Sequence, residues 1–356
     1  MGRINSGHTL AQAIFLKSNQ NDVSSKTLNK LSEKILAVVN GGDKQITLKT
    51  LEQALRHVDS LKNTPAQEKM QKLLFDRYPG AALTFAEESL ELNEQPGVLL
   101  SCADIRLMSS MIVAQRELHP KIKLNMFRSV DDLVRFVMKQ AGPYQGQAVV
   151  SMARSDEQHE PHFAAVDIRV SPEGFRSMVV YDSGILQRNR ELGVAHGYKS
   201  LVEGIRFLEK RLNVLINQVG FVEIGAQKSP SDCGVFALNT AIQNFKDESV
   251  TKWLIGKMDA NKQVMTRFYD TSAFGYIRDK HLKVGVTLPP KYHKHDHSIS
   301  TLKKMGDGSV NKRGESVSQR AEYFAVKRDG RVYSNSIEHK RIGYYQDVVG
   351  QLKKGK

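Results

Sequence analysis

The sequence predicts an α+β fold, in which antiparallel strands lie beside helices. Apolar residues at three- and four-residue spacing predict helices over residues 27–39, 47–61, 68–78, 103–118 and 129–140. The pattern then changes: residues 147–153 form a short apolar run, and within 162–170 the apolar Val166, Ile168 and Val170 alternate with Asp167 and Arg169. Consecutive strands followed by helices favour α+β over a doubly wound sheet.

Each element of this region has a local signal. The residues SPEG at 171–174 supply a turn between the strand at 162–170 and a second strand at 175–182. A helix is predicted over 198–215 and a strand over 217–224. A last helix, 233–245, begins at Cys233. Ser129, with Asp132 three residues later, predicts the N-cap of the helix at 129–140.

Composition limits the class of protein. A chain of 356 residues is long enough for a sizeable core and for about two domains. No apolar run approaches the ~20 residues that span a bilayer, and the N-terminal cluster AIFL is too short for a cleavable signal peptide. Cys102 and Cys233 can form at most one disulfide, which suits a reducing compartment. We therefore expect a soluble protein that works in a cytosol.

The net charge of +14 is concentrated at the C-terminal end. From Lys280 to Lys356 there are 17 Lys and Arg against 7 Asp and Glu. Such an excess serves nucleic acid, an anionic membrane, a compact polyanion, or only a solvated surface. The sequence contains no nucleic-acid motif and no interleaved stacking aromatics, so nucleic acid is not an expected partner.

The first 30 residues are rich in Ser, Asn, Gln and Lys and read as a flexible leader. They open with MGRINS, which fits the pattern for N-myristoylation at Gly2. Lipidation would place the protein on a membrane. The alternative is that these residues are an ordinary disordered N-terminal segment without a lipid.

Three residues have the chemistry of a cysteine nucleophile and its base. His162 opens the first strand of the hairpin and Asp182 closes the second, so both belong at one edge of the sheet. A carboxylate there orients the imidazole and stabilises its charged form. Cys233 opens a helix, whose dipole favours a thiolate. Gln227 and the backbone N–H of Cys233 are candidate donors to an oxyanion. Taken singly, the cysteine also suits a buried structural thiol, and the other residues suit an ordinary surface.

The blocks PHFAAVDIR, MVVYDSG and AQKSPSDCGVFAL resemble the His, acid and Gln-x5-Cys-Gly blocks of the YopJ family of bacterial effector acetyltransferases. Further blocks are also similar to the family: residues 104–125, LPPKYHKH at 288–295 and IEHKRIGYYQDVV at 337–349. The resemblance covers roughly residues 100–350 and implies a core like that of ubiquitin-like-protein proteases, with a mostly helical regulatory region. In the family the acid is often Glu, and Asp182 resembles that of some plant-pathogen members.

The resemblance implies a cysteine-dependent transfer of acetyl from acetyl-CoA to Ser, Thr or Lys of host signalling or immunity proteins, kinases among them. It implies delivery into the host cytoplasm by a type III secretion system. It also implies activation by inositol hexakisphosphate, with five residues in the matching blocks as its ligands: Arg106, Lys294, His295, Lys340 and Arg341. We expect a leader over 1–30, a catalytic core over 31–275, and a basic regulatory region over 276–356 that packs back on residues near 100–110.

Other interpretations stay open. His293, His295 and His297 alternate along the chain, which would suit a zinc site on a strand, but a polyanion site explains the same segment, so we expect no metal. The same three catalytic residues could serve a cysteine isopeptidase acting on ubiquitin or a ubiquitin-like modifier. A non-catalytic basic binding protein or host-membrane adaptor is the third alternative, and it predicts that the biological effect survives the loss of Cys233 or His162.

Overall fold

The computed structural model describes residues 79–93, 98–155, 162–184, 193–229, 231–259, 279–282, 288–305, 308–328 and 330–354. Gly2, the leader and the helices predicted before residue 79 lie outside these ranges. The chain divides into two compact units, Met1–Met111 with Arg341–Lys356, and Ile112–Lys340. The domain boundaries expected near residues 30 and 275 also lie outside the described residues and stay predictions.

In the first unit, a buried ion pair joins two helices. This unit holds α5 (Pro79–Glu91), α6 (Val98–Leu118) up to Met111, and α15 (Ser336–Lys354) from Arg341 onward. Arg341 donates from Nε and Nη2 to the carboxylate of Asp104, at 2.8–3.1 Å, and the Tyr345 hydroxyl donates to Asp104 Oδ1 at 2.6 Å. Both charged side chains are almost fully buried. Each charge therefore needs the other to offset the cost of its removal from water.

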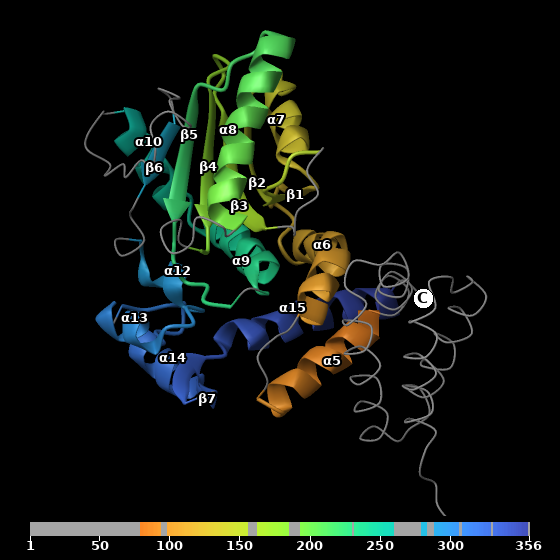
Figure 1. The fold of residues 1–356 in the computed structure, drawn as a ribbon, viewed down its shortest axis with the longest axis vertical. Helices are drawn as coiled ribbons and strands as arrows, with labels where there is room; N and C mark the ends of the chain where they lie inside the picture. Colours follow the sequence, from red (N-terminus) through yellow and green to blue (C-terminus); the bar gives the residue numbers. More distant parts are fainter. Residues whose placement is uncertain are drawn as a thin grey trace, which may run out of the picture. The chain divides into compact units, whose positions relative to one another are not determined.

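The second unit is built on a mixed sheet, which has six strands among the described residues (Figure 1). The strands are β1 (Leu124–Phe127), β2 (Tyr144–Ser151), β3 (Phe163–Val170), β4 (Arg176–Asp182), β5 (Gln218–Glu223) and β6 (Asp279–Leu282). They lie in chain order; β2, β3 and β4 are antiparallel neighbours, while β1 with β2, β4 with β5, and β5 with β6 are parallel. The predicted hairpin at 171–174 is present, with Gly174 at a φ of 81° that favours glycine.

Helices cover both faces of this sheet (Figure 1). On one face, α7 (Val130–Met138) and α8 (Gly193–Leu212) pack on the alternating apolar residues of β2–β5 and form the main core. The N-cap of α7 is Ser129, whose Oγ accepts from the Asp132 N–H at 3.2 Å. The other face carries α9 (Cys233–Lys246) and α10 (Glu248–Asp259). The α+β prediction is confirmed.

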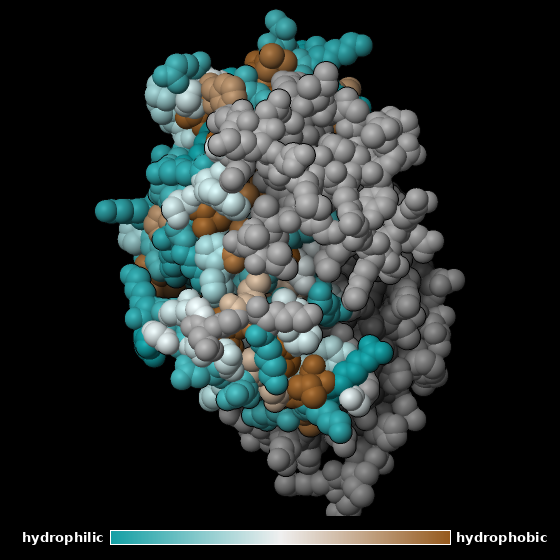
Figure 2. All heavy atoms as spheres, turned by 90° about the vertical axis from the view of Figure 1, so that its left-hand side faces the viewer, coloured by the Kyte–Doolittle hydropathy of each residue, from teal (hydrophilic) through white to brown (hydrophobic). Residues whose placement is uncertain are grey.

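The segment after β6 is helical with one hairpin. It contains α12 (Pro290–His293), α13 (Ile299–Lys304), α14 (Val317–Tyr323), β7 (Ala325–Arg328) and β8 (Arg331–Ser334). A small core of its own consists of Leu302, Val310, Val317 and Ala321. The face in Figure 2 is mostly hydrophilic where residues are described, with scattered apolar side chains. No helix within the described ranges combines the length and apolarity that crossing a membrane requires.

Candidate active site

The structure brings His162 and Asp182 into contact. His162 directly precedes β3, and Asp182 is the last residue of the neighbouring antiparallel strand β4. His162 Nε2 lies 2.6 Å from Asp182 Oδ2. The Asp182 side chain is fully buried and that of His162 is 14% exposed, so the imidazole can meet a reactant while its partner stays sheltered from water.

Asp182 is itself held in place, because its Oδ1 accepts from the Gly184 N–H at 2.7 Å. Burial works against the charged imidazole, but the charge and hydrogen bond of Asp182, with a further hydrogen bond to Cys233, hold the pKa of His162 well above its usual range. Since Nε2 faces the carboxylate, Nδ1 is the ring nitrogen left for the thiol. The three residues therefore form one connected set.

Cys233 is the first residue of α9 and is 5% exposed. Its place at the N-terminus of a 14-residue helix puts the sulfur where the helix dipole favours negative charge. Neither Cys233 nor Cys102 forms a disulfide. The candidate nucleophile, base and acid thus lie at the start of α9, directly before β3 and at the end of β4, all within the same unit.

Gln227 lies on the loop between β5 and α9, and its amide is fixed at both ends. Ser183 Oγ donates to Gln227 Oε1 at 2.7 Å, and Gln227 Nε2 donates to the Ser229 carbonyl at 2.6 Å. The backbone N–H of Gln227 also donates to the Ser183 carbonyl, next to Asp182 in the chain. An amide nitrogen carries two hydrogens, so the bond to Ser229 is compatible with a second donor function, which stays a prediction.

Four cations gather in the same unit, Lys246, Lys294, Arg320 and Lys340, and we call them the basic cluster. Burial and the three neighbouring cations lower the pKa of Lys294 to about 8. Arg320 also binds the Lys294 carbonyl at 2.7 Å and the Glu315 carboxylate at 2.9 Å. Like charges held this close repel one another, which is typical of a site for a multivalent anion.

The five residues expected to bind a polyanion are distributed unevenly. Lys294 and Lys340 belong to the basic cluster, and His295 lies beneath it, buried, with Nδ1 2.7 Å from Ser336 Oγ. Burial and the same cations hold the pKa of His295 well below its usual range, so this ring stays neutral at pH 7. Arg106 and Arg341 belong to the other compact unit, where Arg341 binds Asp104.

Sequence reasoning did not assign four residues to these sites, and Lys246 of the basic cluster is one of them. Arg320 joins the basic cluster, and Asp232 and His297 contact the loop before Cys233. Asp232 could have been identified from its place directly before the cysteine. Arg320 could not, because nothing in the sequence distinguishes it from the other C-terminal cations. The alternating histidines do not share a strand, because His293 ends α12 and His297 follows a turn. Within the described ranges, no group of three or more His, Cys, Asp or Glu is arranged to hold a metal ion.

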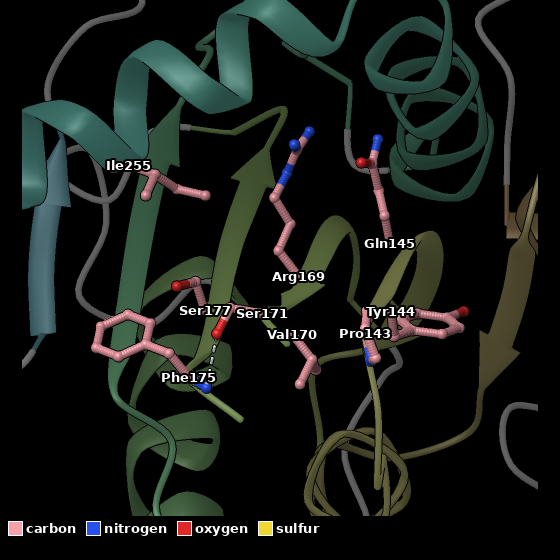
Figure 3. A pocket seen from close by; sticks show the side chains of 9 residues that line it. All are labelled: Pro143, Tyr144, Gln145, Arg169, Val170, Ser171, Phe175, Ser177 and Ile255. Atoms are coloured by element: carbon pink, nitrogen blue, oxygen red, sulfur yellow. Dashed lines mark hydrogen bonds between the residues drawn. The ribbon is translucent and has the colours of Figure 1, made fainter. Parts of the chain in front are cut away.

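A hollow of about 530 Å³ lies at the opposite ends of β2, β3 and β4 from the catalytic residues. Figure 3 shows Arg169 and Gln145 pointing to the same side of the sheet within it. Arg169 Nε donates to the buried Asp167 carboxylate at 3.1 Å, so this cation is already neutralised by the protein. The hollow contains none of His162, Asp182 or Cys233.

Comparison with known proteins gives one consistent family. The family described as YopJ Serine/Threonine acetyltransferase matches residues 80–347. YopJ of Yersinia pestis is 21% identical over 261 residues, which cover 69% of this chain and 81% of that protein. HopZ1a of Pseudomonas syringae pv. syringae is 22% identical over 261 residues, which cover 63% of this chain and 66% of that protein. Both are named serine/threonine-protein acetyltransferases.

Solved structures agree on the fold. The structure of HopZ1a in complex with IP6 and CoA matches with a TM-score of 0.64 at 18% identity, covering 80% of this chain and 98% of that chain. A deletion variant of AvrA with IP6 and CoA matches with a TM-score of 0.57 at 19% identity, covering 78% of this chain and 99% of that chain. With a family match over three quarters of its length, the chain belongs to the YopJ serine/threonine acetyltransferase family.

Proposed function

We propose that this protein transfers acetyl from acetyl-CoA to Ser, Thr or Lys side chains through an acetyl-cysteine intermediate on Cys233. The observation that carries the proposal is the contact of 2.6 Å between His162 and Asp182 beside a cysteine at a helix N-terminus. Family membership supplies the reaction class, since the relatives are named serine/threonine-protein acetyltransferases.

In the first half-reaction, the Cys233 sulfur forms a bond to the acetyl carbon while His162 holds the thiol proton. The bond from that carbon to the CoA sulfur breaks, and His162 returns the proton to the departing thiolate. Gln227 and the Cys233 backbone N–H donate to the oxyanion, and removal of one such donor typically slows catalysis by about 10²–10³-fold.

In the second half-reaction, His162 removes the proton from an acceptor hydroxyl or amine as that atom attacks the acetyl-cysteine. The carbon–sulfur bond breaks and the thiolate is restored. Asp182 keeps the imidazole in one orientation and stabilises its charged form in both steps. The 5% exposure of Cys233 limits the access of water to the intermediate.

The activator we propose is inositol hexakisphosphate, bound by the basic cluster. The fit is chemical: Lys294 has a pKa near 8 because burial and the charges of Lys340, Arg320 and Lys246 outweigh the nearby Glu315 carboxylate. A bound polyanion would neutralise their repulsion, and that free energy would order the segment that carries them. The ligand roles expected for Arg106 and Arg341 stay predictions.

The family's effectors acetylate host proteins, and we propose host signalling or immunity proteins, kinases among them, as substrates. We also propose delivery by a type III secretion system into the host cytoplasm, with membrane attachment if Gly2 is lipidated. The Ser- and Asn-rich leader of the sequence supports this route.

The test is mass spectrometry of the purified full chain with acetyl-CoA, with and without inositol hexakisphosphate, beside Cys233→Ala. Acetylation that requires the polyanion and vanishes in the variant supports the proposal. Absence of any acetyl adduct, together with cleavage of a ubiquitin-like-modifier probe, would assign the isopeptidase instead. A biological effect that persists in both Cys233→Ala and His162→Ala would indicate a non-catalytic binding protein.

A further inference from the structure

His297 binds the loop that carries Gln227 on both sides of that residue. The His297 N–H donates to the Ala226 carbonyl at 3.1 Å, and the Lys228 N–H donates to His297 Nδ1 at 2.9 Å. Ala226 and Lys228 are the two chain neighbours of Gln227. The backbone that aims the Gln227 amide is therefore fixed by one histidine, which lies 69 residues after Lys228 in the chain.

The same imidazole reaches the residue before the nucleophile. His297 Nε2 lies 3.4 Å from Asp232 Oδ2, and Asp232 is fully buried and precedes Cys233. Ser229 Oγ donates to the same carboxylate oxygen. The ring also meets Phe236 of α9 edge-on, at 5.3 Å between centroids. His297 thus contacts the loop at its start, at its end and on the helix that follows.

On its other side, His297 is connected to the basic cluster. Its carbonyl accepts from the Ser334 N–H at 3.0 Å, at the end of β8. Two residues later, Ser336 Oγ contacts His295 Nδ1 at 2.7 Å and accepts from Arg320 Nη2 at 2.9 Å. The Ser336 N–H donates to Ser334 Oγ at 3.4 Å, so hydrogen bonds connect Arg320, through Ser336, Ser334 and His297, to the loop before Cys233 within one compact unit.

We infer that His297 is a positioning residue: it holds Gln227 and Cys233 in their reactive arrangement and carries the effect of a polyanion on the basic cluster to that loop. The inference deepens the proposed function and rests on it. The contacts that give His297 this role are with the backbone of residues 226–228 and with the Asp232 carboxylate.

The test compares His297→Leu with His297→Asn. Leucine keeps much of the volume but offers no acceptor to Lys228, whereas the Asn side-chain oxygen can take the place of Nδ1. We expect His297→Leu to slow acetyl-enzyme formation by about tenfold to hundredfold, because small misplacements near a reacting centre have effects of this size. His297→Asn should recover most of this loss.

Three further measurements distinguish a positioning role from a general loss of folding or ligand binding. The half-saturating acetyl-CoA concentration and the calorimetric affinity for inositol hexakisphosphate should stay unchanged in His297→Leu, while stimulation by the polyanion falls. The matched control is His119→Ala, which removes an imidazole that packs on Phe245 at the other end of α9, at 6.1 Å. This control should keep the wild-type rate. His297→Ala serves the same test if leucine prevents folding.

Wild-type rate and polyanion stimulation in His297→Leu would overturn the inference, and so would His297→Asn reacting as slowly as His297→Leu. If the wild-type protein itself forms no acetyl-enzyme, the proposed function fails, but His297 is still tested by iodoacetamide labelling of the Cys233 peptide. Labelling that is slower in His297→Leu and restored in His297→Asn supports the positioning role; equal labelling in all forms refutes it.

Discussion

His162 Nε2 lies 2.6 Å from Asp182 Oδ2, and the carboxylate is wholly buried. The carboxylate and Cys233 together raise the pKa of His162 against the effect of burial. The charged imidazole is thus stabilised in the folded protein, and this contribution to stability is complete below the unfolded pKa of about 6.5 and is lost as the pH rises through the higher folded value.

Asp182→Asn should lower the pKa of His162 and slow acetyl-enzyme formation by about 10⁴-fold, the size of effect known for loss of the orienting carboxylate in a triad. An NMR titration of the His162 ring measures the first effect, and single-turnover kinetics measure the second. Asp182→Glu is the control that keeps the negative charge, and its rate of acetyl-enzyme formation should fall less than that of Asp182→Asn. An unchanged pKa in Asp182→Asn would mean that the carboxylate is not the main partner.

Binding of inositol hexakisphosphate should be linked to protonation of Lys294. At pH 8 about half of the free protein carries this proton, because the pKa of Lys294 is near 8. A bound polyanion raises that pKa, so binding takes up as much as about half a proton at pH 8, and affinity declines as the pH rises above 8.

Calorimetry in buffers of different ionisation enthalpy measures this uptake. Lys294→Arg is the matched control, since arginine keeps the positive charge but does not titrate here. The wild-type protein should take up more protons than Lys294→Arg, and this difference removes the contribution of the ligand's own phosphates. Equal uptake in both proteins would show that Lys294 is already charged in the free state.

Arg341→Met should lower the free energy of unfolding by about 3–5 kcal/mol, because it leaves the Asp104 carboxylate buried without its cation. Tyr345→Phe removes a single hydrogen bond to the same carboxylate and should cost only about 1 kcal/mol. Denaturant unfolding measures both. Equal effects of the two substitutions would contradict the pairing of Arg341 with Asp104, and the polyanion affinity of Arg341→Met tests its predicted role as a ligand.

Gly146→Ala should destabilise the protein by about 1–3 kcal/mol through overpacking in β2. A Cβ at this position would lie 2.8 Å from the Lys123 carbonyl and against the Tyr144 ring. Gly142→Ala is the matched control four residues earlier, where a Cβ would meet nothing within 4 Å. Thermal unfolding compares the two; the prediction is wrong if Gly146→Ala is as stable as the control.

The contact between His162 and Asp182 followed from local patterns. Three local features determine which strand ends lie side by side: the strand pattern at 162–170, the four-residue turn and the second strand. All three lie within about twenty residues of sequence. The N-cap at Ser129 and the start of α9 at Cys233 were likewise local signals. Local signals of this kind are the strongest that a single sequence carries.

The missed features depend on distant pairing. β1 has no clear alternation and is defined by its parallel pairing with β2, some twenty residues later. The basic cluster combines α9 with residues 294, 320 and 340, which only folding brings together. The sequence suggested for His297 only a place in a zinc site, because its actual contacts are with the backbone of residues 226 and 228, some seventy residues earlier.

The pairing of β3 with β4 has a consequence for how related chains can diverge. Ala165 pairs with Tyr181 and Val166 with Val180, which fixes the face on which Asp182 lies. Adding or deleting one residue within β4 before Tyr181 would invert the faces of the residues that follow, so that Asp182 would point to the opposite side of the sheet. A change in the length of β4 would therefore separate Asp182 from His162 even though it lies away from the nucleophile, whereas a substitution in the hairpin leaves the register intact.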